Sequence, residues 1–189
     1  MYQIGISSCS EDLTEALFAD YKKAGVQAIE ISFGDKLNKD LDYAEIKRLS
    51  DIYGIELWSY HLPFSPFSEL DLSHPDLCDH TVEYFKGLIK EGSSIGIKRF
   101  VVHSSGEPIC DEQRATHLEC SKRSLARLAE YADRFNGIIC VENLPRSCIG
   151  RNSEEMLELL SAHENLRSCF DTNHLLSLEK PHEYIRKIG

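Results

Sequence analysis

The sequence predicts an α/β fold in which a parallel sheet forms part of an eight-fold barrel, and two patterns support this prediction. Short β-prone runs alternate with longer segments whose apolar residues recur every three or four positions, so strands and helices follow one another. Such alternation implies parallel strands joined by right-handed crossovers. Five of the six predicted strands also place an ionisable side chain inside or at the C-terminal end of the run: Glu30, His61, His103, Glu142 and Asp171.

The position of these side chains favours a barrel over a doubly wound sheet. A barrel directs the ends of many strands toward one axis, whereas a doubly wound sheet binds its ligand at one switch point, usually beside a Gly-rich phosphate turn. Neither a Gly-x-Gly-x-x-Gly motif nor a Walker turn occurs in the sequence. We therefore expect a (β/α) TIM-barrel-type parallel sheet.

Six strand and helix pairs account for the whole chain. Two helix starts carry capping signals, because Ser10 stands before an acidic pair and Asn152 precedes Glu155 by three positions. The predicted strands are Gln3–Cys9, Gln27–Phe33, Ile55–His61, Lys98–His103, Gly137–Glu142 and Arg167–Asp171.

Side chains of a strand alternate between the barrel axis and the helix layer. If Glu142 points to the axis, Val141 faces the helices, and the same count in the second strand directs Glu30 inward and Ile29 and Ile31 outward. Six units fit into 189 residues at roughly 31 residues each, so eight units need about 250. We expect one partial barrel domain over residues 1–189, a fragment or truncated product that lacks the seventh and eighth strands.

Composition restricts the function classes. The chain has 21 Lys and Arg against 31 Asp and Glu, a formal charge of −10, with 42% hydrophobic and 28% charged residues. These proportions are typical of a folded soluble protein. An acidic surface disfavours nucleic acid, since DNA affinity comes largely from Lys and Arg that neutralise phosphates.

Neither a membrane segment nor a disulfide framework is predicted. The longest run without charged residues, Leu57–Ser68, is shorter than the roughly 20 residues of a membrane-spanning helix. Met1–Ser10 has no secretory signal, so we expect a cytoplasmic protein. The seven cysteines form no Cys-x-x-Cys pair, and we interpret them as reduced, mostly buried thiols.

Two carboxylates form the strongest candidate site. Glu142 lies in Val141-Glu-Asn-Leu-Pro145 and Asp171 in Phe170-Asp-Thr-Asn-His174, and each follows a β-prone run where a barrel places its active site. Two carboxylates with histidines nearby suit a divalent metal ion, namely Mn²⁺, Mg²⁺, Co²⁺ or Zn²⁺. The alternative is that the acids cap the following helices or pair with arginine.

Four short motifs resemble a known family. His61-Leu-Pro-Phe64, Val102-His-Ser-Ser-Gly-Glu-Pro108, Glu142-Asn-Leu-Pro145 and Asp171-Thr-Asn-His174 occur in this order at strand spacing. Together they are similar to the sugar phosphate isomerase/epimerase family of xylose-isomerase-like TIM barrels, and the similarity extends through all 189 residues. They are less specific for a substrate than for the superfamily.

The resemblance implies roles for five residues. It makes Glu142 and Asp171 metal ligands, with the remaining ligands on a seventh and an eighth strand that this sequence does not contain. It makes His174 a substrate-binding residue. His61 and His103 match histidines that line the pocket or, in DNA-repair relatives, bind additional zinc.

The implied reaction is a metal-dependent isomerisation or epimerisation of a sugar or sugar phosphate. Glu142 is the candidate base that removes a proton beside a carbonyl, and the metal stabilises the resulting enediolate. Return of the proton requires a second group, which the resemblance assigns to the missing eighth strand. We therefore expect the 189-residue chain alone to have little or no turnover.

Further candidates are less specific. Arg146 either reaches a substrate phosphate or carboxylate, or is solvated or caps a helix. Glu30 either forms a hydrogen bond inside the barrel or binds sugar hydroxyls. The long segment Pro63–Pro75, with Phe64 and Phe67, is either a flap over the pocket or a small satellite core. Five histidines are interpreted as surface residues: His74, His80, His117, His163 and His182.

Two other functions remain open at this point. An endonuclease-IV-like apurinic-site DNA-repair enzyme shares the barrel and the progression of histidines and acids, although the net charge of −10 opposes DNA binding. The other is a non-catalytic barrel fragment that binds a sugar or metal weakly or persists as a homo-oligomer through its open sheet edges.

Overall fold

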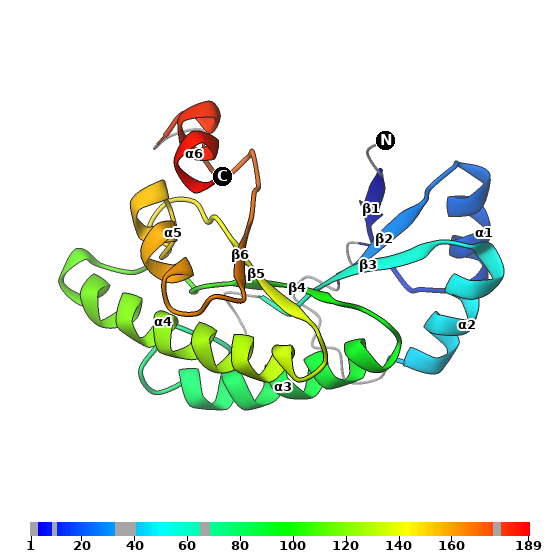
Figure 1. Cartoon of the computed structure of the whole chain (residues 1–189), viewed down its shortest axis with the longest axis horizontal. Coiled ribbons are helices and arrows are strands. Elements are labelled where there is room, and N and C mark those ends of the chain that lie inside the picture. The colour runs from blue at the N-terminus through cyan, green and yellow to red at the C-terminus, as the bar shows by residue number, and fades with distance from the viewer. Residues whose placement is uncertain (1–3, 9–10, 33–40, 65–68, 176–178) are drawn as a thin grey trace.

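The computed structural model describes residues 4–8, 11–32, 41–64, 69–175 and 179–189. Within this part of the chain, six parallel strands form one open sheet in the order β1-β2-β3-β4-β5-β6, with the helices on its outer side (Figure 1). The predicted fold class is confirmed. The strands are β1 (Gly5–Ser7), β2 (Ala28–Ser32), β3 (Glu56–His61), β4 (Arg99–His103), β5 (Ile138–Glu142) and β6 (Leu166–Cys169). The helices are α1 (Glu15–Lys23), α2 (Tyr43–Tyr53), α3 (Cys78–Ser94), α4 (Asp111–Asp133), α5 (Ser153–Leu160) and α6 (Pro181–Ile188).

The hydrophobic core lies between the sheet and the helices. Ile29 and Ile31 of β2 and Val141 of β5 are fully buried in this layer. Glu30 and Glu142 alternate with these residues and therefore face the concave side of the sheet, as the strand period predicts.

Side-chain caps fix the starts of three helices. The side chains of Thr14, Asp42 and Asn152 each accept a backbone N–H from the first turn of α1, α2 and α5. The predicted Asn152 cap is confirmed, with its Oδ1 2.9 Å from the backbone nitrogen of Glu155. The cap predicted at Ser10 lies outside the described residues, and α1 begins only after Thr14.

All six strands cover fewer residues than predicted. β1 covers Gly5–Ser7. The two ends of the predicted strand, Gln3 and Cys9, lie outside the described residues. β6 ends at Cys169, so the prediction that Asp171 ends this strand is wrong. The cause is Asn143, whose Oδ1 accepts the backbone N–H of Asp171 at 2.7 Å while its Nδ2 donates to the Asp171 carbonyl at 2.9 Å. The side-chain amide of Asn143 thus replaces the backbone hydrogen bonds that would otherwise extend the strand to Asp171.

One prediction about the histidines is wrong. His117 on α4 is buried, because its Nδ1 lies 2.9 Å from Ser73 Oγ in the segment that precedes α3. The other four predicted surface histidines are exposed or half-buried: His74, His80, His163 and His182.

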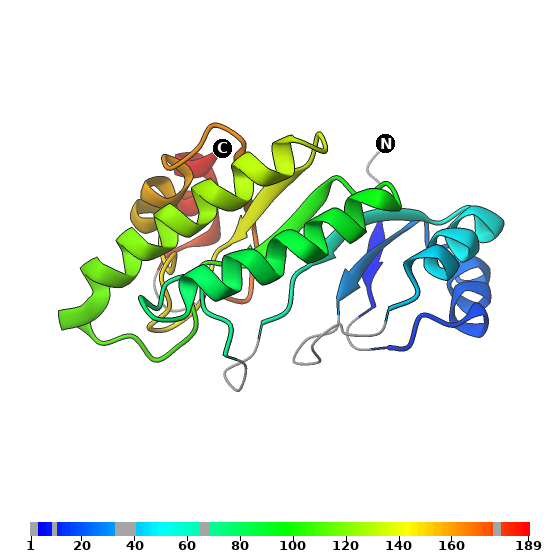
Figure 2. The same cartoon turned by 90° about the horizontal axis from the view of Figure 1, so that it is seen from below.

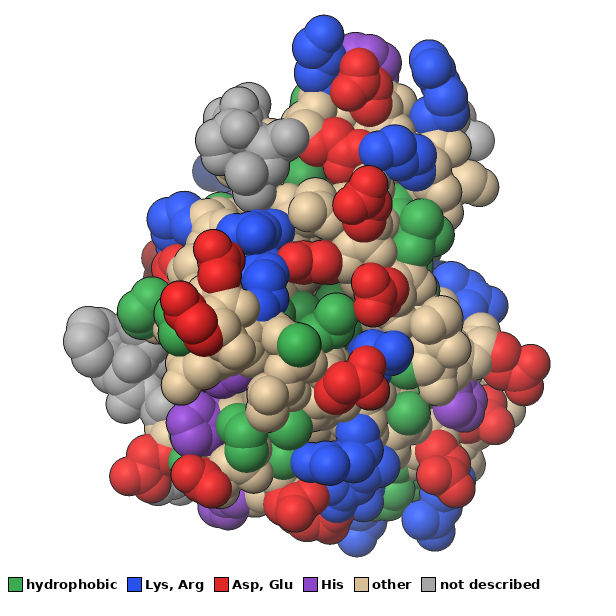
Figure 3. All heavy atoms as spheres, turned by 90° about the vertical axis from the view of Figure 1, so that its left-hand side faces the viewer, with side chains coloured by type: hydrophobic (Ala, Val, Ile, Leu, Met, Phe, Trp, Pro, Cys, Tyr) green, Lys and Arg blue, Asp and Glu red, His purple; other side chains and the backbone are tan. Residues whose placement is uncertain are grey.

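Three of the six described cysteines are buried, so the prediction of mostly buried thiols holds for half of them. None of the described cysteines forms a disulfide; Cys78, Cys120 and Cys148 are buried, Cys140 and Cys169 half-buried and Cys110 exposed, and Cys9 lies outside the described residues. On the face formed by α5, α6 and the adjacent end of α4, acidic and basic side chains are interspersed (Figure 3). None of the described helices combines the length and apolar composition that crossing a membrane requires.

An ion pair between two helices fixes the loop between β5 and α5. Arg114 on α4 contacts the Glu155 carboxylate on α5 at 2.6 and 2.7 Å, and it also donates to the carbonyls of Ser147 and Cys148. Glu155 in turn accepts the backbone N–H of Gly150 at 2.9 Å. Burial by itself raises the pKa of Glu155, but these donors outweigh it, and the pKa lies below its ordinary value.

We expect Glu155→Gln to destabilise the protein more at pH 7 than at pH 3. A carboxylate with a lowered folded pKa contributes stability above its unfolded pKa of about 4.3 and loses this contribution as pH falls through the folded value. Urea denaturation at both pH values measures the difference. Glu154→Gln, at an exposed neighbour on the same helix, is the control. An equal loss of stability at both pH values would contradict the expectation.

Helix α3 lies close against the sheet at Gly92. A Cβ atom there would lie 2.9 Å from Phe100 Cε1 and 3.1 Å from Tyr60 Cδ1. Both rings are fully buried, so neither moves aside without disturbing the core. Figure 2 shows α3 and α4 lying side by side across the sheet.

The substitution Gly92→Ala should lower the free energy of unfolding by about 1–3 kcal/mol, because the added methyl group overpacks this contact. Gly87→Ala is the matched control on the same helix: it has no atom within 4 Å of the new Cβ, and alanine favours the helix by up to about 1 kcal/mol. Urea denaturation compares the two variants. Equal stabilisation of both would show that the contact at Gly92 is loose.

Candidate active site

The C-terminal ends of β3, β4 and β5 bring three predicted site residues into contact. His61, His103 and Glu142 are the last residues of these strands, and the register pairs His103 directly with Glu142. Glu142 Oε2 lies 2.9 Å from His61 Nε2 and 3.1 Å from His103 Nε2. The Glu142 side chain is only 9% exposed, so a carboxylate sits almost out of water at the centre of the rim.

The hydrogen bonds of His61 indicate its protonation. Its Nδ1 lies 2.9 Å from the carbonyl oxygen of Leu62, which only accepts, so Nδ1 carries a proton. Its Nε2 faces the Glu142 carboxylate and therefore needs a second proton or a bound cation. Burial lowers the pKa of His61, but the hydrogen bond and charge of Glu142 outweigh burial and raise the pKa above its ordinary value.

The pKa values of His103 and Glu142 are both lowered, but for different reasons. Burial lowers the pKa of His103 below its ordinary value, and the hydrogen bond to Glu142 offsets this only in part. Burial by itself raises the pKa of Glu142, yet the hydrogen bonds from His103 and His61 bring that pKa well below its ordinary range. One buried carboxylate oxygen thus lies within hydrogen-bond distance of the Nε2 atoms of two imidazole rings.

Asp171 and His174 reach the same carboxylate from the loop after β6. His174 Nδ1 lies 2.7 Å from the carbonyl oxygen of Asn143 and 3.5 Å from Glu142 Oε1, while its Nε2 lies 3.7 Å from Asp171 Oδ2. Asn143, which also holds the backbone of Asp171, therefore positions both residues. The register places β5 and β6 side by side, with Glu142 opposite Cys169.

This donor set fits a divalent metal ion. Two groups of three residues offer ligand atoms within 4.8 Å of one another, His61 with His103 and Glu142, and Glu142 with Asp171 and His174. In both His61 and His174, Nδ1 faces a backbone carbonyl and Nε2 points into the cluster, the arrangement typical of metal-ligating histidines. Carboxylate oxygens and imidazole nitrogens suit Mn²⁺, Co²⁺ and Zn²⁺.

A cavity of about 300 Å³ lies beside the cluster. His103 and His174 contribute to its wall, together with Phe64 and Arg146. The Phe64 ring packs over both strand-end histidines, with centroid distances of 4.1 Å to His103 and 4.7 Å to His61. The start of the predicted flap therefore lies against the site, and Leu70, Asp71 and Leu72 line the cavity, whereas Phe67 lies outside the described residues.

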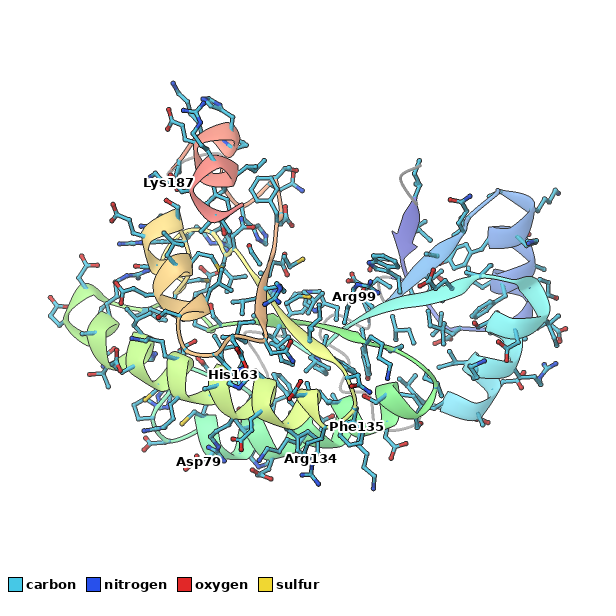
Figure 4. All side chains as sticks on the ribbon, viewed as in Figure 1. Asp79, Arg99, Arg134, Phe135, His163 and Lys187 are labelled. Carbon is cyan, nitrogen blue, oxygen red and sulfur yellow. The ribbon has the colours of Figure 1, made fainter. Side chains whose placement is uncertain are left out.

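Arg146 and Glu30 line two different cavities. Arg146 lines the cavity but is bound by Glu107, with Nε 2.9 Å from Oε2 and a second contact between Nη2 and Oε1. Glu30 does not touch the cluster. It accepts a hydrogen bond from Ser59 Oγ at 2.9 Å, deeper in the barrel, and lines a second cavity of about 340 Å³. Arg99, labelled in Figure 4, also lines this cavity and stacks on Trp58, 3.6 Å from the ring centroid.

Sequence reasoning missed three residues of the site. Asn143 is fully buried. The one sequence feature that could have indicated its role is that it is a polar residue directly after the glutamate at the end of the strand. Glu107 stands in a quoted motif, but its pairing with Arg146 joins segments that are far apart in sequence. Asp71 carried no local signal at all.

Comparisons with known proteins agree with this geometry. Residues 18–188 match the model of the family described as xylose isomerase-like TIM barrel. A comparison with curated proteins gives no match.

Three solved structures illustrate the likeness in fold. A D-tagatose 3-epimerase-like protein has a TM-score of 0.83 and 23% identity, over 99% of this chain and 71% of that one. D-psicose 3-epimerase with D-tagatose, from Clostridium cellulolyticum H10, has a TM-score of 0.80 and 19% identity, over 98% and 70%. A 3-keto-D-glucoside 4-epimerase from E. coli has a TM-score of 0.78 and 14% identity, over 100% and 75%.

The family match covers most of the chain, and the fold agrees with it. The chain therefore belongs to the xylose isomerase-like TIM barrel family.

Proposed function

We propose that this chain carries the metal-binding and proton-abstracting residues of a sugar isomerase or epimerase. The observation that carries the proposal is the buried Glu142 carboxylate, which is in contact with His61 and His103 and faces Asp171 and His174 across the rim. The similar structures of ketose and keto-sugar epimerases support the same reaction class.

The proposed metal ligands are Glu142 and Asp171, and His174 offers a third donor from the same loop. A divalent ion bound by them, Mn²⁺, Mg²⁺, Co²⁺ or Zn²⁺, would supply Lewis-acid stabilisation of the charge that develops on a sugar carbonyl. Asn143 fixes the Asp171 backbone, so this ligand is held by a buried side chain instead of by a free loop.

Glu142 is the proposed base. Its low pKa keeps it ionised at neutral pH, so it is always ready to accept a proton although its basicity is weak. Oε2 lies within hydrogen-bond distance of the two histidines, whereas Oε1 faces His174 at 3.5 Å, on the side of the proposed metal ligands. Phe64 covers the histidines and reduces contact with water, which strengthens these electrostatic interactions.

The other functions predicted from the sequence are not favoured by a specific observation. An apurinic-site endonuclease remains an alternative, and salt-dependent binding to abasic-site DNA would support it. Assembly into a homo-oligomer also stays a prediction, which sedimentation tests directly.

Metal binding should depend on the two carboxylates. We expect Glu142→Gln and Asp171→Asn to weaken Mn²⁺ binding at least about tenfold, because each removes an anionic ligand from a shared centre. Calorimetric titration of the chelator-treated protein with Mn²⁺ measures the affinity. Glu119→Gln, at an exposed carboxylate on α4, is the control with unchanged affinity. Binding that survives both substitutions would place the metal elsewhere.

Proton exchange should exceed epimerisation. The 189-residue chain has one carboxylate assigned as base, and within the described residues its carboxylate neighbour Asp171 is assigned to the metal. We expect slow exchange of a ketose C–H in D₂O with Mn²⁺, with little epimer, and no exchange in Glu142→Gln. NMR of D-fructose follows both. Epimer formation at about 1 s⁻¹ or faster, an ordinary enzyme rate, would contradict this expectation.

A further inference from the structure

Apart from Glu107, which binds Arg146, the described lining of the cavity beside the Glu142 cluster includes one carboxylate that the proposed reaction does not use. Asp71 lies in the segment between β3 and α3 and lines the cavity. Its Oδ1 accepts three hydrogen bonds, from the Ser73 backbone at 2.7 Å, from Ser73 Oγ at 2.7 Å and from the His74 backbone at 3.2 Å. These bonds use the oxygen that points back into its own segment.

The second oxygen of Asp71 lies beside Gly106, and both residues line the cavity. Oδ2 lies opposite Gly106, where an added Cβ would come within 2.9 Å of it. Because glycine has no side chain, Gly106 leaves room for this oxygen at the wall of the cavity. Within the described residues, neither a hydrogen bond nor a cation satisfies Oδ2. A half-buried carboxylate oxygen in this position is available to a hydroxyl donor.

The surrounding residues hold Asp71 in place. Its backbone N–H donates to Thr81 Oγ1 on α3 at 2.9 Å, and the neighbouring Leu72 carbonyl accepts Ser124 Oγ of α4 at 2.8 Å. Ser73, which binds Oδ1, is itself fully buried and in contact with His117 of α4 at 2.9 Å. Two helices thus fix the carboxylate before any ligand arrives, which is what a precise binding residue requires.

The charge of the cavity opposes a second anion. Among its described lining residues, Arg146 is the one arginine or lysine, and Glu107 binds it through two contacts. The Glu107–Arg146 pair is neutral overall, so no arginine or lysine among the described lining residues remains to pair with Asp71. A sugar phosphate would bring a group of about −1.5 to −2 charges toward this carboxylate.

The remaining wall suits the carbon face of a sugar. Phe64, Leu72, Phe85 and Leu144 line it with apolar surface. The volume of about 300 Å³ is at the lower end of small-molecule sites. A monosaccharide that extends from Glu142 into this space would meet carbon on one side and Asp71 on the other.

We propose that Asp71 is a specificity-determining residue that accepts a hydrogen bond from the terminal hydroxyl of an unphosphorylated ketose. This inference rests on the proposed function, because it takes the reacting end of the sugar to lie at Glu142. Its consequence is selection between free and phosphorylated sugars, with the uncompensated carboxylate rejecting the phosphate and the hydroxyl satisfying Oδ2.

Two variants test the role of Asp71 in different ways. Asp71→Asn keeps an oxygen for the Ser73 bonds and places an amide N–H₂ donor where Oδ2 stood. Gly106→Ala keeps the aspartate at position 71, but its methyl group would lie 2.9 Å from Oδ2, so the carboxylate must shift from the position proposed to meet the sugar; its result stands if Asp71→Asn fails to fold. Asp76→Asn is the control, an exposed aspartate of the same segment outside the cavity. Thermal unfolding verifies that each variant is folded.

The measurement is ligand binding, followed by calorimetry or saturation-transfer NMR with Mn²⁺ and again with a chelator. The probes are D-fructose, D-fructose 6-phosphate and 6-deoxy-D-fructose. We expect D-fructose to bind at least about tenfold more tightly than its 6-phosphate, and both test variants to weaken D-fructose binding by about tenfold. The 6-deoxy sugar should bind the unaltered protein and Asp71→Asn equally, because it lacks the hydroxyl.

Different failures have different meanings. Tighter binding of the 6-phosphate, or D-fructose binding that neither variant weakens, would overturn the role of Asp71 and leave the proposed function standing. An equal loss in Asp76→Asn would also overturn it, since the effect would then not belong to the cavity. Absence of binding for all three probes would overturn this inference together with the proposed sugar site.

Discussion

The burial of one negative charge, on Glu142, governs the organisation of this protein. A carboxylate removed from water is costly unless it is paired or bound to metal, and here imidazole groups on two neighbouring strands provide the pairing. That solution works only because parallel strands end at one rim and because the register sets His103 opposite Glu142. The sheet therefore does more than enclose a core: its pairing pattern determines which donors reach the buried oxygen.

The period of the strands accounts for what sequence reasoning predicted well. Alternation alone put Ile29 and Ile31 in the helix-facing core and Glu142 on the opposite face. Strand-end positions alone brought His61 and His103 together, because parallel strands of similar length leave little freedom at their ends.

Side-chain contacts between residues that are distant in sequence account for the features that sequence reasoning missed. Asp171 follows β6 instead of ending it because the amide of Asn143, 28 positions earlier, binds its backbone. His117 is buried because Ser73, 44 positions earlier, meets its ring. Such bonds depend on how loops fold back on helices, and no local pattern of apolar residues encodes them. Glu30 shows a related limit: its strand face was evident, but its depth below the rim depended on the register with Ser59.

The two strands at the margins of the sheet are also its shortest. β1 has three residues and β6 has four, whereas the four inner strands have five or six. Unpaired N–H and C=O groups along a long, flat strand act as a template for aggregation with other chains. Within the described residues each margin offers only a short row of such groups, which makes it a poor starting point for fibril growth.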